Sequence, residues 1–126
     1  MFAYLLVMLG GAIGAAFRYH VGRVALAQLG PGFPFGTWIV NILGGLLMGV
    51  LAGVLARGPA LEGEPLRLFL GVGVLGGFTT FSSFSLETFN MISRGEALIA
   101  AAYAISSVAG SVLALVCGTY LSRALA

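Results

Sequence analysis

Four long apolar runs constrain the fold of this chain more than any other feature. Only 8% of its 126 residues are charged and 60% are hydrophobic, whereas soluble domains carry roughly a quarter charged residues. A helix needs ~20 apolar residues to cross a bilayer. The sequence therefore predicts an all-α membrane protein, a single four-span domain over residues 1–126 with spans at about 2–29, 35–55, 66–91 and 97–121.

The third apolar run contains a segment that should break a helix. Residues 76–87 (GGFTTFSSFSLE) hold two glycines, five hydroxyl side chains and the carboxylate of Glu87. Irregular backbone at membrane depth is tolerated only where protein or a water-lined cavity satisfies its free N–H and C=O groups. We therefore expect the third helix to be interrupted near residues 76–80, and the functional site to lie beside that break.

The positive charges are balanced across the predicted membrane. Four spans place both termini on one side, together with the loop between the second and third spans. Three arginines fall on that side and three on the other: Arg57, Arg67 and Arg123 against Arg18, Arg23 and Arg94. Because an excess of Lys and Arg in cytoplasmic loops sets orientation, two interpretations stay open: dual topology with an antiparallel homodimer, or a weakly biased single topology. The net charge of +2 is too small to suggest a nucleic-acid partner.

Polar side chains in the second and fourth spans are candidates for an ion path. Asn41 lies in the middle of the second span, where an unpaired amide would be costly. Its amide either forms a structural hydrogen bond to another helix or donates to a permeating anion. Tyr103, Ser107 and Ser111 recur every four residues and form a polar stripe. Their hydroxyls could donate to an anion, or bond locally to the backbone carbonyl four residues earlier.

Aromatic rings follow the predicted break. Phe81 and Phe84 share one helix face with Thr88, while Ser82 and Ser83 point elsewhere. Phenylalanines at this spacing usually form core, but the positive edge of a ring can also stabilise a small anion. The position beside a helix break weakens the first interpretation, and both stay open.

Two ionisable side chains in or near the spans are functional candidates, Glu87 and Arg18. Charged groups at membrane depth are rare and usually functional, although either could be hydrated near the interface or serve structure by pairing. His20 has no second ligand at helical spacing and is expected to lie at the interface rather than to bind a metal.

Several patterns indicate packing rather than a site. Gly45, Gly49 and Gly53 form a small-residue ridge, and residues 10–14 give a shorter one; both favour close helix packing. Residues 71–76 (GVGVLG) match a dinucleotide fingerprint only by accident, because they lie within an apolar run. The single Cys117 is expected to be a spectator thiol. The sequence contains no nucleophile–base pair, metal-ligand cluster or phosphate-binding loop, so we do not expect an enzyme.

The combination of motifs resembles the Fluc (CrcB-type) fluoride channel family over nearly the whole chain. The resemblance is carried by residues 10–14 (GGAIG) with Arg18-Tyr19, by residues 36–41 (GTWIVN), and above all by residues 76–85 (GGFTTFSSFS) with Glu87. It implies a dual-topology antiparallel homodimer of four-helix subunits with two pores. Trp38 is bulkier than the aliphatic residue expected at its position, which should affect packing more than mechanism.

The resemblance also implies roles for single residues. It assigns the fluoride pores and their vestibules to Arg18, Asn41, Thr80, Phe81, Ser82, Ser83, Phe84, Glu87, Tyr103, Ser107 and Ser111. It further implies a structural Na⁺ at the dimer centre, held by the backbone carbonyls of Gly76 and Thr79 from each subunit.

The function that follows is a passive fluoride channel in a prokaryotic plasma membrane, which exports cytoplasmic fluoride and confers resistance to it. A small multidrug-export-type transporter is the first alternative, but it needs an acid in the first span, where the charged candidates are Arg18 and His20. A non-transporting assembly subunit is the second, and it leaves the hydroxyl cluster of residues 79–85 without a purpose.

Overall fold

The computed structural model describes residues 1–125, apart from the side chains of residues 60–62, and all regular secondary structure in this part of the chain is helical. Four of its helical stretches are long and apolar enough to cross a membrane, with the third spanning Gly63–Ser93. The elements are α1 (Phe2–Leu29), α2 (Phe35–Leu55), α3 (Ala60–Leu66), the π-helix η1 (Arg67–Leu75), α4 (Gly76–Phe78), α5 (Ser82–Ser93) and α6 (Ala97–Ala124). The expected all-α fold with four apolar helices, the third interrupted, is confirmed.

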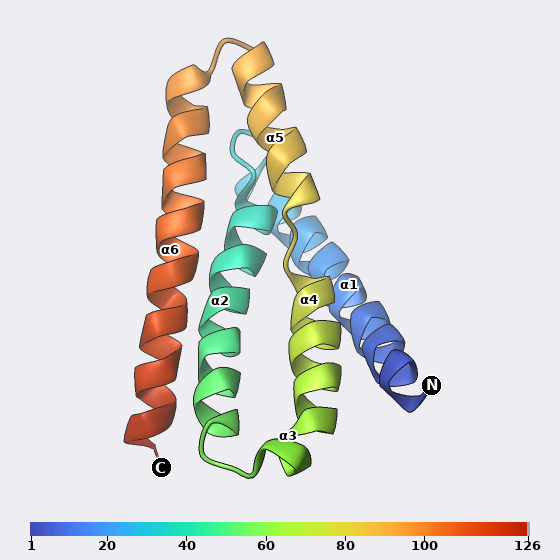
Figure 1. Ribbon diagram of the computed structural model, residues 1–126. Coiled ribbons are helices and arrows are strands. Elements are labelled where there is room, and N and C mark those ends of the chain that lie inside the picture. Colours follow the sequence, from blue (N-terminus) through green and yellow to red (C-terminus); the bar gives the residue numbers. More distant parts are fainter. Residues whose placement is uncertain (126) are drawn as a thin grey trace.

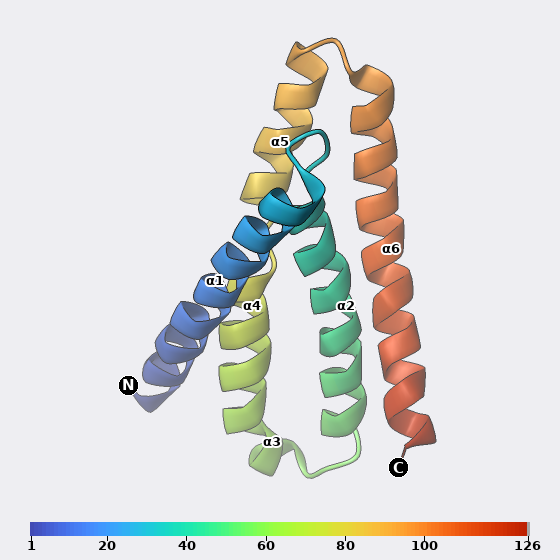
Figure 2. The same ribbon diagram turned by 180° about the vertical axis from the view of Figure 1, so that it is seen from behind.

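The helices stand side by side, with α1 crossing the others at a tilt (Figures 1 and 2). The ends of the chain lie toward the same end of the molecule as α3, as four crossings require. The fourth helix runs three residues past the predicted end at 121, to Ala124. This difference arises because a helix does not stop where its apolar run stops.

Close contact between α2 and α6 depends on the glycine ridge of α2. A Cβ atom at Gly49 would collide with the carbonyl oxygen of Leu115, and one at Gly53 would collide with Ser122 Oγ. In the same way, Gly10 and Gly14 bring the backbone of α1 against η1 and α4. The prediction that these glycines serve packing is confirmed.

The break in the third span lies at residues 79–81, later than its predicted start at 76. Gly76 to Phe78 remain helical, Thr79 is extended with φ −82° and ψ 160°, and α5 begins at Ser82. Gly76 itself has the ordinary right-handed angles φ −63° and ψ −37°. The two glycines therefore do not bend the chain, and partners for the backbone after Phe78 must stabilise the break.

Few side chains are buried within one chain. Val40, Met91 and Tyr103 are the largest fully buried ones among the described residues, whereas most of the long apolar side chains on α1 and α6 are exposed. Such surfaces are stable only against lipid or another chain. The helices thus form a membrane-type bundle with a small buried core within the single chain.

Candidate functional site

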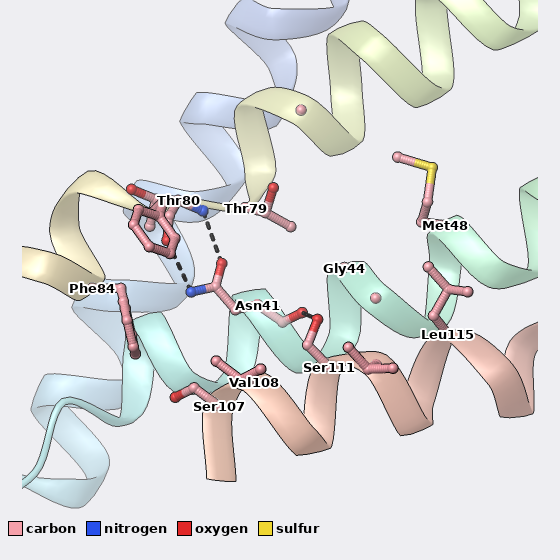
Figure 3. A pocket seen from close by; sticks show the side chains of 14 residues that line it. Asn41, Gly44, Met48, Thr79, Thr80, Phe84, Ser107, Val108, Ser111 and Leu115 are labelled. Atoms are coloured by element: carbon pink, nitrogen blue, oxygen red, sulfur yellow. Dashed lines mark hydrogen bonds between the residues drawn. The ribbon is translucent and has the colours of Figure 1, made fainter. Parts of the chain in front are cut away.

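A groove of about 510 Å³ lies beside the helix break, between α2, the residues of the break and α6 (Figure 3). Many of the predicted site residues line it: Asn41, Gly76, Thr79, Thr80, Phe81, Phe84, Ser107 and Ser111. Met48, Val108, Val112 and Leu115 complete much of its apolar wall. The groove therefore combines a polar band with an apolar lining, as expected for a site where an ion loses its water.

The carboxamide of Asn41 satisfies the broken backbone at Thr80. Asn41 Nδ2 donates to the Thr80 carbonyl oxygen at 2.9 Å, and Asn41 Oδ1 accepts from the Thr80 N–H at 2.8 Å (Figure 3). Of the two interpretations of Asn41, the structural bond is therefore present. Asn41 can also donate to an anion, because Nδ2 carries two hydrogens and the bond to Thr80 uses one.

The hydrogen bonds at the break leave two backbone carbonyls without their helical donors. In a continuous helix, the N–H of Thr80 would bond to the Gly76 carbonyl and the N–H of Ser83 to the Thr79 carbonyl. Instead, Thr80 N–H donates to Asn41 Oδ1 and Ser83 N–H donates to Thr80 Oγ1 at 3.2 Å. Gly76 and Thr79 both line the groove, so their carbonyls, having lost their helical donors, are available to a ligand.

The two phenylalanines predicted to share a face do line one groove. Their ring centroids lie 5.5 Å apart, and the rings are tilted by 42°. Phe81 is 77% exposed, whereas Phe84 also packs on Tyr103, at 5.2 Å between centroids. Thr88 lies outside the groove lining, and its hydroxyl donates to the Phe84 carbonyl at 2.8 Å. Phe81 thus presents its ring on the open side of the groove.

The polar stripe of α6 divides between two environments. Ser111 Oγ donates to the Asn41 carbonyl at 3.1 Å. Ser107 is only 4% exposed, lines the groove, and its Oγ has no hydrogen-bond partner among the described residues. Tyr103 lies outside the groove lining and is fully buried. Ser107 is therefore the member of the stripe whose hydroxyl is buried without a hydrogen-bond partner.

Glu87 belongs to a second polar site, which is separate from the groove. It accepts from Tyr103 Oη at 3.1 Å and from Thr37 Oγ1 at 2.6 Å. Glu87 and Thr37 also line a cavity of about 270 Å³ beneath the loop between α1 and α2. Sequence reasoning did not assign Thr37 a role, although its position one turn before Asn41 on α2 was a usable signal.

The remaining predicted residues surround the break without lining the groove. Arg18 Nε donates to the Gly77 carbonyl at 3.1 Å, which supports the end of α4. Ser82 Oγ lies 3.3 Å from Thr80 Oγ1, and the backbone of Ser83 bonds to the same hydroxyl. His20 is exposed, and the described residues contain no cluster of His, Cys, Asp and Glu that could hold a metal ion.

Comparison with known proteins identifies the family. Residues 5–119 match the family model described as CrcB-like protein, Camphor Resistance (CrcB). The chain belongs to the CrcB family. Among its relatives, proteins called fluoride-specific ion channel FluC are 54% identical over 128 residues in Novosphingobium aromaticivorans, covering all of both chains, and 55% identical over 123 residues in Phenylobacterium zucineum, covering 98% and 97%. A third, from Sphingopyxis alaskensis, is 53% identical over 119 residues and 94% of each chain.

Membership of the CrcB family confirms the resemblance found in the motifs. The relatives compared here are named as ion channels, so the expectation that the chain is not an enzyme is also confirmed. Together with the four long apolar helices, it shows a multi-pass membrane protein. The small multidrug-export alternative finds no support.

Proposed function

We propose that this CrcB-family protein is a passive, fluoride-selective channel in a prokaryotic plasma membrane. Neutral hydrogen fluoride enters cells from acidic surroundings and dissociates in the cytoplasm, and the channel lets the trapped anion leave, which confers resistance. The observation that carries this proposal is the groove, in which Asn41, Ser107 and the rings of Phe81 and Phe84 meet beside a helix break. The names of its bacterial relatives support the choice of ion.

Fluoride is small and tightly hydrated, so a selective pore must replace its water with closely spaced donors. The second Nδ2 hydrogen of Asn41 and the unpaired hydroxyl of Ser107 can donate to an anion in the groove. Ring edges of Phe81 and Phe84 add weaker positive potential without a charge that would trap the ion. Chloride, which is larger and more weakly hydrated, gains less from such a narrow path.

A second copy of the chain, inserted antiparallel, closes the groove in this proposal. Gly76 and Phe81 are exposed on the groove side, as are Val108 and Val112 of α6. A pore cannot remain open along its length to lipid, so another chain must cover this side. The balance of three arginines against three favours a partner in the opposite orientation, which gives two pores related by symmetry.

A structural Na⁺ at the centre of that dimer is part of the proposal. Its ligands would be the carbonyl oxygens of Gly76 and Thr79 from both copies. The residues fit, because these carbonyls have lost their helical donors and lie at the end of a half-helix. Carbonyl oxygens are ligands that hard cations prefer, and the ion would neutralise the partial negative charges that meet there.

The other predicted residues extend the path in this proposal. Glu87 and Tyr103 continue it beyond Phe84, toward the cavity lined by Thr37. Ser82 and Ser83 contribute to its vestibule, and Arg18 supports the end of α4.

The proposal is tested by ion efflux from liposomes that contain the purified protein. Loaded vesicles should release fluoride down its gradient when a potassium ionophore balances charge, and should retain chloride. A multidrug-export-type transporter would instead need a proton gradient and an organic cation. Fluoride release at the rate of empty vesicles would contradict the channel function.

A further inference from the structure

We propose that Trp38 is a positioning residue, which acts through Ser106 to keep the hydroxyl of Ser107 free for a passing anion. This inference rests on the proposed channel function, in which Ser107 lines the pore. It assigns a role to two residues outside the groove lining. The argument starts from the hydrogen bonds of α2 and α6.

The indole of Trp38 bonds to α6. Trp38 Nε1 donates to Ser106 Oγ at 3.0 Å, and Ser106 Oγ donates in turn to the Tyr103 carbonyl at 3.3 Å. An indole N–H inside a membrane must find an acceptor. Because the Ser106 oxygen receives the indole hydrogen, its own hydrogen points away from Trp38, toward the backbone of α6.

The Tyr103 carbonyl is also the acceptor that Ser107 would use. A serine in a helix commonly bonds to the carbonyl four residues earlier, and for Ser107 that carbonyl belongs to Tyr103. A carbonyl oxygen has two lone pairs. Within α6 the backbone N–H of Ser107 uses one of them, and the hydroxyl of Ser106 uses the other. This occupation explains why the buried Ser107 Oγ has no partner among the residues described.

Two bonds between α2 and α6 lie on either side of Ser107. Trp38 bonds to Ser106 on one side, and Ser111 donates to the Asn41 carbonyl on the other. Since adjacent helical residues point about 100° apart, a rotation of α6 by one residue would exchange Ser106 and Ser107. The paired bonds prevent that rotation. The ring of Phe33, edge-on to Trp38 with centroids 6.2 Å apart, holds the indole in place.

Loss of the indole N–H should therefore act at a distance. Trp38→Phe keeps the aromatic packing against Phe33 but frees the hydroxyl of Ser106 to rotate. Once the Ser106 hydroxyl rotates off the Tyr103 carbonyl, Ser107 turns onto that carbonyl, and the pore loses a donor. We expect fluoride efflux to fall roughly fivefold, the equivalent of one lost hydrogen bond.

The experiment compares efflux from liposomes for Trp38→Phe, Ser106→Ala, Ser107→Ala and the double variant Trp38→Phe/Ser107→Ala. Trp38→Phe and Ser106→Ala should give similar losses. In the Ser107→Ala background, Trp38→Phe should change efflux by less than twofold, because the donor it controls is already gone. Ser122→Ala is the matched control: Ser122 makes the same bond to the carbonyl three residues earlier, that of Thr119, at the other end of α6, and its loss should leave efflux unchanged.

A crystal structure of Trp38→Phe gives a readout that does not depend on flux. It should show Ser107 Oγ within hydrogen-bond distance of the Tyr103 carbonyl. An unchanged Ser107 side chain, or an equal fivefold loss from Trp38→Phe with and without Ser107, would overturn the positioning role. Absence of fluoride efflux from the unmodified protein would overturn the proposed function instead, and the side chain of Ser107 in the variant structure would still decide the role of Trp38.

Discussion

The carboxamide of Asn41 forms two hydrogen bonds with the backbone N–H and C=O of Thr80. These bonds replace the helical bonds that the backbone of Thr80 lacks. The pairing places a side chain of α2 inside the break of the third span. One residue thereby stabilises the interruption and faces the groove that it creates. Stability of the break and permeation should for this reason be coupled at position 41.

Substitution of Asn41 tests this coupling. Asn41→Ala leaves the N–H and C=O of Thr80 unpaired, at a cost of about 1–3 kcal/mol for each group that water does not reach. The variant should melt at a lower temperature in detergent and conduct poorly. Asn41→Asp retains an acceptor for the N–H but sets a carboxylate against the carbonyl, and its negative charge should abolish fluoride efflux.

Ser85→Ala serves as the control for Asn41. Ser85 is exposed and bonds only locally, to the Phe81 carbonyl at 2.9 Å. Its removal should leave melting and efflux near those of the unmodified protein. If Asn41→Ala melted at the same temperature as Ser85→Ala, the pairing with Thr80 would not stabilise the break.

The two phenylalanines of the groove should differ in what their loss does. Replacement of Phe81 or Phe84 by Ile keeps bulk but removes the ring, so efflux should fall roughly two- to tenfold, the range expected for one aromatic interaction. Only Phe84→Ile should also lower thermal stability, because Phe84 packs on the buried Tyr103 while Phe81 is 77% exposed. Phe89→Ile, on an exposed part of α5, is the control. Unchanged efflux in both groove variants would show that the two rings serve only in packing.

Substitutions at Gly76 and at Gly77 should differ in their effect on the stability of the single chain. Gly76 is an ordinary helical residue, and a Cβ there would approach only the Gly71 carbonyl, at 3.7 Å. A Cβ at Gly77 would press on the backbone of Gly11 in α1. Gly77→Val should thus destabilise the fold by about 1–3 kcal/mol through overpacking.

Gly76→Ala should leave the fold of the single chain intact. Because Gly76 is exposed and lines the groove, any loss of dimer in this variant, measured by cross-linking in liposomes, would locate the partner at that face. A melting temperature reduced as far as in Gly77→Val would contradict the distinction.

Orientation can be biased through the termini. Addition of two or three Lys to the N-terminus adds charge to the side that already holds Arg57, Arg67 and Arg123, which should force one topology. If the channel is an antiparallel dimer, the biased chain alone should fail to protect cells against fluoride, and co-expression with an oppositely biased chain should restore protection. Full protection by the biased chain alone would exclude the antiparallel arrangement.

Sequence patterns predicted those parts of the fold that depend on one helix at a time. Run length gave the four spans, and hydroxyls beside Gly76 located the break to within a few residues. The partners of Glu87 and Trp38 were not predicted, because they depend on the rotation of α5 and α2 against α6. Spacing placed Tyr103 and Ser107 on one face, yet it could not tell that Tyr103 reaches Glu87 while Ser107 faces the groove.

A backbone sodium site should tolerate changes in side chains and respond to the cation. Thr79→Ser retains the hydroxyl that donates to the Leu75 carbonyl at 3.0 Å and leaves the carbonyl of Thr79 in place, so efflux should be preserved. Replacement of Na⁺ by N-methyl-D-glucamine during purification should instead weaken the dimer and slow efflux, since the facing carbonyls of Gly76 and Thr79 would then repel one another. The measurement is dimer fraction and fluoride efflux against Na⁺ concentration, with Thr79→Ser run alongside. Efflux that is independent of Na⁺ in the unmodified protein, with the dimer intact, would show that the free carbonyls serve only to end α4.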